Sequence, residues 1–153
     1  MINRIFSDNK IKDYGKIFIL IFYLLFIFIM SACCSKNTDK LDRISSEIYS
    51  EIDLPKPLPL KNFKSDGCSC FPDGNWIECC IKHDIYYWMG GTRQERLEAD
   101  RELRKCVSEK GYKITGFLMY YGVRAGGVWW LPTSFRWGFG WEYPQSGPLN
   151  KPY

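Results

Sequence analysis

The sequence predicts a mainly α-helical domain whose centre is a disulfide-linked antiparallel pair of helices. Residues 76–89 and 93–109 both have the pattern of helices, and a short break at Gly90 and Gly91 separates them. A connection this short turns the second helix back along the first. The 153-residue chain also has seven cysteines, which in a small exported protein indicate disulfides rather than metal ligands.

The N-terminal segment predicts export. Basic residues precede an unbroken apolar run of 14 residues, from Ile17 to Met30. A signal-peptide core has about 7–15 apolar residues, whereas a membrane-spanning helix needs about 20. The run leads into Met30-Ser31-Ala32-Cys33, which resembles the bacterial lipobox. That resemblance implies cleavage before Cys33 and attachment of lipid to this cysteine.

The expected mature protein is therefore a lipoprotein of the bacterial cell envelope, anchored in the outer membrane or exported. Residues 1–32 are the expected signal peptide and residues 33–40 a polar tether. The alternative for the apolar run is a short uncleaved anchor. The formal net charge of the whole chain, +4, is too small to indicate a nucleic-acid partner.

Residues 41–65 are expected to form an N-terminal helix and an extended connector. Apolar residues recur three and four positions apart, which is the spacing of one helix face. They are Leu41, Ile44, Ile48 and Ile52. Prolines at alternate positions from 55 to 59 then exclude a helix and indicate an extended chain.

Residues 66–110 contain a cysteine- and glycine-rich loop followed by the helix pair. Asn75, with Glu78 three residues later, is a predicted cap for the first helix. Thr92 and Glu95 form a predicted capping box for the second, which ends before Gly111.

Residues 111–153 are the aromatic and glycine-rich C-terminal part of the same domain. A short helix is expected around residues 116–123, and loops or a hairpin are expected beyond it. Four of the six tryptophans lie here. They fit either core packing or a surface at the lipid headgroup level, where Arg124 and Arg136 could meet phosphates.

The second helix carries Asp100 on its apolar face, where an ionised carboxylate needs a partner. If Cys79 bonds Cys106, the antiparallel register places Asp100 opposite position 85. It then lies roughly 3 Å along the axis from both His83 and Tyr87, at ~1.5 Å per residue. These two residues are four apart and share one helix face.

This arrangement predicts a catalytic site. A carboxylate that accepts one imidazole N–H leaves the other ring nitrogen free as a general base toward water. Asp84 points about 100° away around the helix and could face the loop before it. One carboxylate beside backbone carbonyls is a suitable calcium site, because Ca²⁺ prefers oxygen ligands.

The same residues carry a family resemblance. The pattern CC-x-x-HD-x-x-Y at residues 79–87 resembles the active-site helix of the secreted phospholipase A2 family. GCSCFPDG at residues 67–74 is similar to its calcium loop, and ADRELRKC at residues 99–106 to its second long helix. The resemblance covers about residues 66–107. It implies a phospholipase A2-like fold and calcium-dependent hydrolysis of the sn-2 ester of glycerophospholipids, without an acyl-enzyme.

The resemblance also implies roles for individual residues. His83 would be the general base, Asp100 its partner and Tyr87 a support for Asp100. Calcium would be held by one side chain and three backbone carbonyls: Asp84, with Ser69, Phe71 and Asp73. The partner would be a phospholipid membrane surface, and the protein would be a monomer.

Other assignments stay open. Cys80 would bond either Cys68 or Cys70. The stripe from Leu41 to Ile52 would be core, or the lining of an acyl channel. Because the family has glycines where this chain has Phe71 and Asp73, the alternative function is a non-catalytic lipoprotein module that binds lipid or a protein partner.

Overall fold

The structure is a computed structural model and describes residues 38–69 and 71–148. This part of the chain contains four helices and no strand, which confirms the mainly α-helical prediction. The helices are α2 (Thr38–Glu51), α3 (Ile77–Met89), α4 (Arg93–Glu109) and α5 (Lys113–Gly126). The predicted signal peptide, the lipidation site at Cys33 and the loop residue Cys70 lie outside the described residues.

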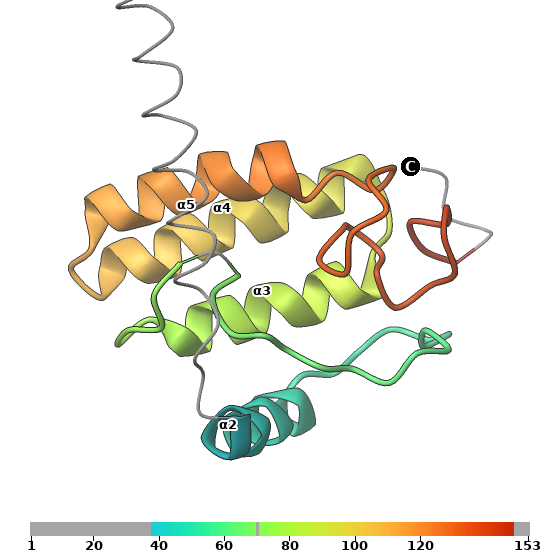
Figure 1. The fold of residues 1–153 in the computed structure, drawn as a ribbon, viewed down its shortest axis with the longest axis horizontal. Helices are drawn as coiled ribbons and strands as arrows, with labels where there is room; N and C mark the ends of the chain where they lie inside the picture. The colour runs from blue at the N-terminus through green and yellow to red at the C-terminus, as the bar shows by residue number, and fades with distance from the viewer. Residues whose placement is uncertain (1–37, 70, 149–153) are drawn as a thin grey trace, which may run out of the picture. The chain divides into compact units, whose positions relative to one another are not determined.

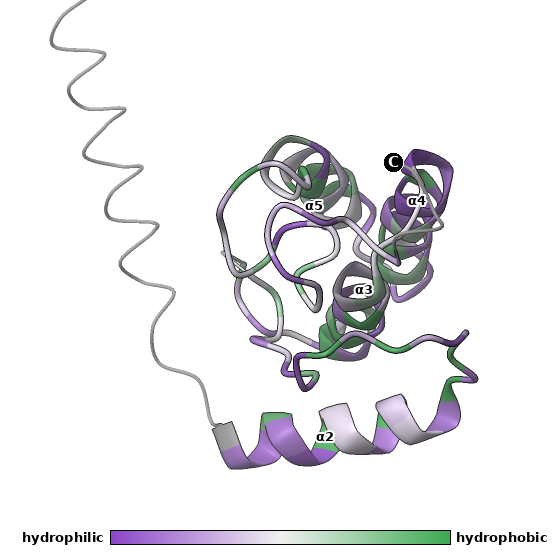
Figure 2. Ribbon diagram, turned by 90° about the vertical axis from the view of Figure 1, so that its right-hand side faces the viewer, coloured by the Kyte–Doolittle hydropathy of each residue, from purple (hydrophilic) through white to green (hydrophobic). Residues whose placement is uncertain are grey.

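The last three helices pack side by side. Figure 1 shows α3, α4 and α5 running alongside one another, with α4 between the other two. Helix α2 crosses α3 at a steep angle. Figure 2 shows this, since α2 lies across the view while α3, α4 and α5 are seen nearly end on. No helix within residues 38–69 and 71–148 combines the length and apolarity needed to cross a membrane.

Helix α2 packs its predicted apolar stripe onto α3. Leu41 and Ile48 are buried against Ile81 and Ile85, both fully buried, with further apolar side chains around them. This supports core packing for the stripe. The helix begins at Thr38, inside the segment predicted as tether, with Asp39 in its first turn, where a carboxylate stabilises the positive helix end.

Helix α3 begins differently from the prediction. Its N-cap is Trp76, which makes no capping hydrogen bond from its side chain. The predicted cap, Asn75, instead directs its side-chain amide toward the hydroxyl of Tyr112, 3.5 Å away. The end is as predicted, since the helix stops at Gly90, which has a φ of 63° that favours glycine.

Helix α4 has the predicted capping box. The Thr92 hydroxyl accepts from the Glu95 amide, and the Glu95 carboxylate accepts from the Thr92 amide at 2.7 Å. Its buried face includes Arg96, Ala99 and Leu103, whereas Leu97 is only half-buried. The buried Arg96 belongs to the candidate active site, where it contacts Tyr87 and Asp100.

Helix α5 is longer than predicted, and residues 127–148 form turns rather than a hairpin. Trp137 and Trp141 are buried, which supports the core reading for these two tryptophans. The expectation that Arg136 meets phosphates is wrong. Arg136 is 2% exposed and donates to the carbonyls of Trp137, Trp141 and Gln145, so it fastens the C-terminal loop from inside.

Candidate active site

Helices α3 and α4 bring three of the predicted site residues into contact. The His83 Nε2 atom lies 2.9 Å from Asp100 Oδ1. The Tyr87 hydroxyl donates to the same oxygen at 2.8 Å. All three side chains are buried, and Asp100 is fully so. The helix register thus produces the contacts that the sequence predicts.

The second carboxylate oxygen of Asp100 has cationic partners that the sequence interpretation missed. Arg124 Nη1, from α5, donates to Oδ2 at 2.7 Å. Arg96 Nε lies 3.9 Å from Oδ2 and donates to the Tyr87 hydroxyl at 3.2 Å. Arg96 precedes Asp100 by four residues, a spacing that could have signalled this pair. Arg124 is 24 residues away, and no local pattern indicates it.

Arg96 also fastens the end of α5 to this cluster. Its Nη2 atom donates to the carbonyls of Val123 and Arg124, each at 2.9 Å. Gly127 follows, and a Cβ built there would lie 2.4 Å from the Tyr87 ring. The absence of a side chain at Gly127 is therefore what lets α5 end directly over Tyr87.

The electrostatics of the cluster keep Asp100 ionised. Burial by itself would raise the pKa of Asp100. The hydrogen bonds from His83, Arg124 and Tyr87 outweigh burial and hold the pKa below its ordinary value of 3.8. Burial, and then the charge of Asp100, raise the pKa of Tyr87 well above its ordinary 10.0, so Tyr87 stays a neutral donor.

This ionisation state assigns the proton on His83. An ionised carboxylate is only an acceptor, so the imidazole nitrogen that faces it must carry hydrogen. Nε2 therefore carries the hydrogen that faces Asp100. In the neutral form of the ring, Nδ1, on the side turned away from Asp100, has the lone pair. A nitrogen in this state can accept a proton.

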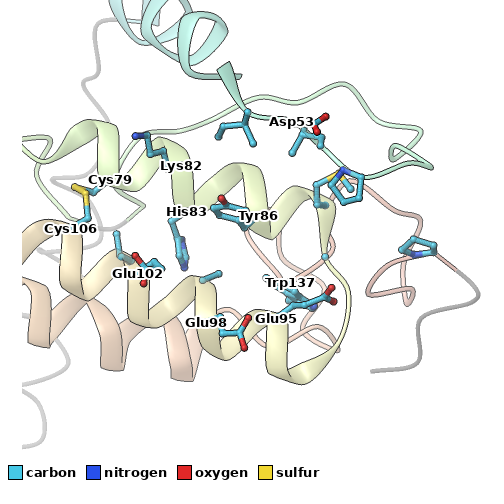
Figure 3. A pocket seen from close by; sticks show the side chains of 18 of the residues that line it. Asp53, Cys79, Lys82, His83, Tyr86, Glu95, Glu98, Glu102, Cys106 and Trp137 are labelled. Atoms are coloured by element: carbon cyan, nitrogen blue, oxygen red, sulfur yellow. A yellow bond between two sulfur atoms is a disulfide. The ribbon is translucent and has the colours of Figure 1, made fainter. Parts of the chain in front are cut away.

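His83 lines two separate cavities. The larger is a groove of about 610 Å³ between α3, α4 and residues 52–57. Figure 3 shows the His83 side chain pointing from α3 into this groove, across from Glu98 and Glu102 on α4. The smaller cavity, about 150 Å³, lies on the α5 side, and its wall includes Asp84 and residues 67–69.

The smaller cavity, called here the loop cavity, gathers most of the residues predicted to hold calcium. Ser69, Phe71 and Asp84 line it together with His83. Asp73 does not line it; its carboxylate turns back to accept from the Cys68 amide at 2.9 Å. The carbonyl ligands therefore remain predictions.

The Asp84 carboxylate and the neighbouring backbone carbonyls are oxygen donors, the type that Ca²⁺ requires. Ser65 holds the Asp84 carboxylate in place by donating to Oδ2 at 2.5 Å, and the Gly67 amide donates to the Ser65 hydroxyl at 3.0 Å. Among residues 38–69 and 71–148, no three His, Cys, Asp or Glu side chains gather as a metal-binding group. A calcium ion here would depend on Asp84 and backbone oxygens.

Two disulfides support this geometry. Cys79 bonds Cys106 and joins α3 to α4, which is the bridge assumed in predicting the helix register. Cys80 bonds Cys68, which settles the choice left open for Cys80 and ties the loop to α3. Since His83 follows these cysteines by one helical turn, both bridges restrain the part of α3 that carries it.

Comparison with known proteins adds no assignment. No protein-family model matches the chain, and neither a curated protein nor a solved structure matches it. The functional interpretation therefore rests on the site's own geometry and on the resemblance of its motifs.

Proposed function

We propose that the protein hydrolyses the sn-2 ester of glycerophospholipids in the presence of calcium. The observation that carries this proposal is the hydrogen-bonded series from Tyr87 through Asp100 to His83, next to a cavity that also contains Asp84. A neutral imidazole held by a buried carboxylate is the arrangement of a general base. The resemblance to secreted phospholipases A2 supplies the substrate class.

In the proposed reaction His83 moves a proton twice. Nδ1 takes a proton from water while the water oxygen bonds to the ester carbonyl carbon. Asp100 stabilises the resulting imidazolium through Nε2. When the bond to the glycerol oxygen breaks, Nδ1 returns the proton to that oxygen. The products are a fatty acid and a lysophospholipid, and no covalent enzyme intermediate forms.

The loop cavity suits this reaction better than the larger groove. The groove has an excess of acidic side chains, because Asp53, Glu95, Glu98, Glu102 and Glu109 outnumber Lys56 and Lys82, and this excess would repel a lipid phosphate. In the loop cavity, Asp84 with the carbonyls of Ser69 and Phe71 would hold calcium. A bound calcium ion supplies positive charge for the carbonyl and phosphate oxygens of the substrate.

A second candidate function is a non-catalytic lipid- or protein-binding module. The observation in its favour is the Arg124–Asp100 ion pair, because a carboxylate already neutralised by arginine stabilises an imidazolium less strongly. Phe71 also packs against the hydrophobic core around Cys68 and Cys80. The calcium loop of the secreted phospholipases A2, which this loop resembles, has a glycine at that position.

Both candidates share the expected envelope location. We propose that Cys33 is lipidated and anchors the domain to a bacterial membrane. Changing Cys33→Ser in the full chain should move the protein from the membrane fraction to the soluble fraction. Retention of the variant in membranes would favour the uncleaved anchor.

The proposed activity is tested by fatty-acid release from mixed phospholipid micelles. Residues 37–153 form one compact unit that includes both disulfides, so this part is the enzyme to assay. We expect release with calcium, and a loss of at least tenfold with chelator or in Asp84→Asn. Calcium binding by calorimetry should weaken in the same variant. A folded, oxidised domain that releases no fatty acid would favour the binding module.

A further inference from the structure

Helix α5 presents an apolar face to solvent along most of its length. Four large apolar side chains on it are between 45% and 78% exposed: Ile114, Phe117, Leu118 and Tyr121. Their spacing of three, one and three residues places them on one side of the helix. Gly122 and Ala125 continue the same side and are also exposed. These six residues are called the α5 outer face.

The exposure of this face is fixed by close packing on the opposite side. Gly116 and Met119 are buried, and a Cβ built at Gly116 would lie 2.8 Å from the carbonyl oxygen of Arg104 in α4. Val123 and Arg124 are tied by Arg96 at the other end. The helix cannot rotate its outer face inward without breaking these contacts. The buried side of α5 is thus taken up by packing within the domain. The apolar outer face is left to contact a partner outside the domain.

Basic residues border the outer face. The Arg104 guanidinium lies over the Phe117 ring at 5.5 Å and over the Tyr120 ring at 5.9 Å. Arg101 is exposed one turn earlier on α4, and Lys113 is exposed at the start of α5. No acidic residue occurs between Lys110 and Trp141. An apolar stripe with a basic border is complementary to an anionic lipid surface.

Aromatic side chains lie at both ends of the outer face. Tyr112 precedes α5 and is 37% exposed, and Trp130 follows it and is 56% exposed. Tryptophan and tyrosine are enriched at the headgroup level of membranes. Their positions suit a helix that lies along the membrane surface.

A second copy of the chain fits this face less well. A symmetric contact places the same patch of each subunit against its counterpart. It would bring the basic border of one copy, which includes Arg101, Arg104 and Lys113, close to the basic border of the other, and juxtaposed like charges oppose association. An anionic bilayer offers both an apolar layer and the opposite charge.

We propose that the α5 outer face binds an anionic phospholipid surface. The inference also deepens the proposed function, on which this part rests, because Gly122 belongs both to the outer face and to the wall of the loop cavity with His83. A cavity of about 150 Å³ is smaller than the ~300–1,000 Å³ of typical ligand pockets. The cavity would take the ester, while the rest of the lipid stays along α5.

The route from the outer face to the cavity is open at two glycines. A Cβ built at Gly122 or at Gly126 meets no atom within 4 Å, and both residues line the loop cavity. A lipid lying against α5 would thus reach His83 over the edge of the helix rather than through the packed core.

Vesicle binding tests the docking surface. Residues 37–153 would be sedimented with vesicles of phosphatidylglycerol and with vesicles of phosphatidylcholine. The change in tryptophan fluorescence that is lost in Trp130→Phe would follow insertion. We expect tighter binding to phosphatidylglycerol, weakened by salt. The double variant Ile114→Ser/Leu118→Ser should bind at least tenfold more weakly. The matched control is Leu58→Ser/Leu60→Ser, which removes two exposed leucines far from α5 in sequence and should bind like the wild type.

Further arms separate the alternatives. Arg104→Gln should reduce the dependence of binding on salt. His83→Gln should bind vesicles normally whether or not the protein is an enzyme, so a failure of hydrolysis does not affect this test. Equal vesicle binding by both double variants would overturn the proposal. So would sedimentation equilibrium showing a dimer that only the α5 variant loses. Thermal unfolding confirms that each variant is folded.

Discussion

At the scale of single residues, the site is a carboxylate with four hydrogen-bonding or ionic partners. His83 and Tyr87 contact one oxygen of Asp100, and Arg124 and Arg96 contact or approach the other. The helix register predicts the first two partners. It does not predict Arg124, because α5 is positioned by tertiary packing rather than by any spacing in the sequence.

The Arg124–Asp100 pair predicts a pH dependence of stability. Because the pKa of Asp100 is depressed in the folded state, its stabilisation is present above its ordinary pKa of 3.8 and is lost as the pH falls through the folded value. Arg124→Gln should lower the free energy of unfolding at pH 7 by about 1.5–3 kcal/mol. It should also flatten the loss of stability below about pH 4, because removing Arg124 returns the pKa of Asp100 toward 3.8.

Urea unfolding from pH 7 to pH 2.5 measures this effect. Lys105→Gln is the control, because it removes one partner of an exposed ion pair with Glu102 and should change the free energy of unfolding by less than about 1 kcal/mol. An acid dependence that is the same in Arg124→Gln and the wild type would contradict the proposed electrostatics.

The neighbouring tyrosines Tyr86 and Tyr87 provide a second test at this scale. Tyr87→Phe removes a donor to Asp100 and an acceptor for Arg96, so unfolding should become easier by about 1–3 kcal/mol. Tyr86→Phe alters a side chain that is 45% exposed and should have little effect. Chemical denaturation compares the two variants, and equal midpoints would refute the assigned role of the Tyr87 hydroxyl.

At the scale of elements, short polar motifs are predictable and long-range packing is not. The capping box at Thr92 and the break at Gly90 both appear as predicted, since each depends on residues within one turn. The Asn75 cap is wrong because Trp76 takes the cap position and Asn75 reaches toward Tyr112. Helix α5 extends beyond its predicted ends because α4 supports it despite its internal glycines, each costing about 1 kcal/mol.

The turn between α3 and α4 is predicted to need glycine for two reasons. Gly90 has a φ of 63°, and a Cβ there would lie within 3 Å of the Ser146 carbonyl group. Gly90→Ala should therefore destabilise the fold by more than the ~1–3 kcal/mol of backbone strain alone. Gly111→Ala, at φ 96° with no atom near its Cβ, bears only that strain. Similar losses of melting temperature in the two variants would contradict the proposed contact.

The two disulfides should contribute comparable stability. In the chain-entropy model, the Cys79–Cys106 bridge, which spans 27 residues, contributes about 3.6 kcal/mol, and the Cys68–Cys80 bridge, which spans 12, about 3 kcal/mol. Replacing either pair with serine should lower the free energy of unfolding by about these amounts. Loss of Cys68–Cys80 should weaken calcium binding more, because it frees the loop. Equal calcium affinity in the two variants would contradict that role for the loop.

At the scale of the whole molecule, two surfaces meet at His83. The α3–α4 pair supplies the proposed base and its carboxylate, and the loop with α5 supplies the cavity and an apolar face bordered by basic residues. The sequence alone predicts the first, because the relevant residues lie on two consecutive helices. It leaves the C-terminal tryptophans open between core packing and membrane contact, and Trp137 and Trp141 are buried. It does not identify the exposed face of α5.

The proposed function depends on His83 activating water for ester hydrolysis. The most direct test is the initial rate of fatty-acid release by residues 37–153 with calcium, comparing the wild type, His83→Gln and Glu47→Gln. Glu47 is exposed on α2, away from the site, and serves as the control. We expect His83→Gln to lose release by at least a hundredfold and Glu47→Gln to keep the wild-type rate. A folded His83→Gln variant that releases fatty acid at the wild-type rate would contradict the proposed function.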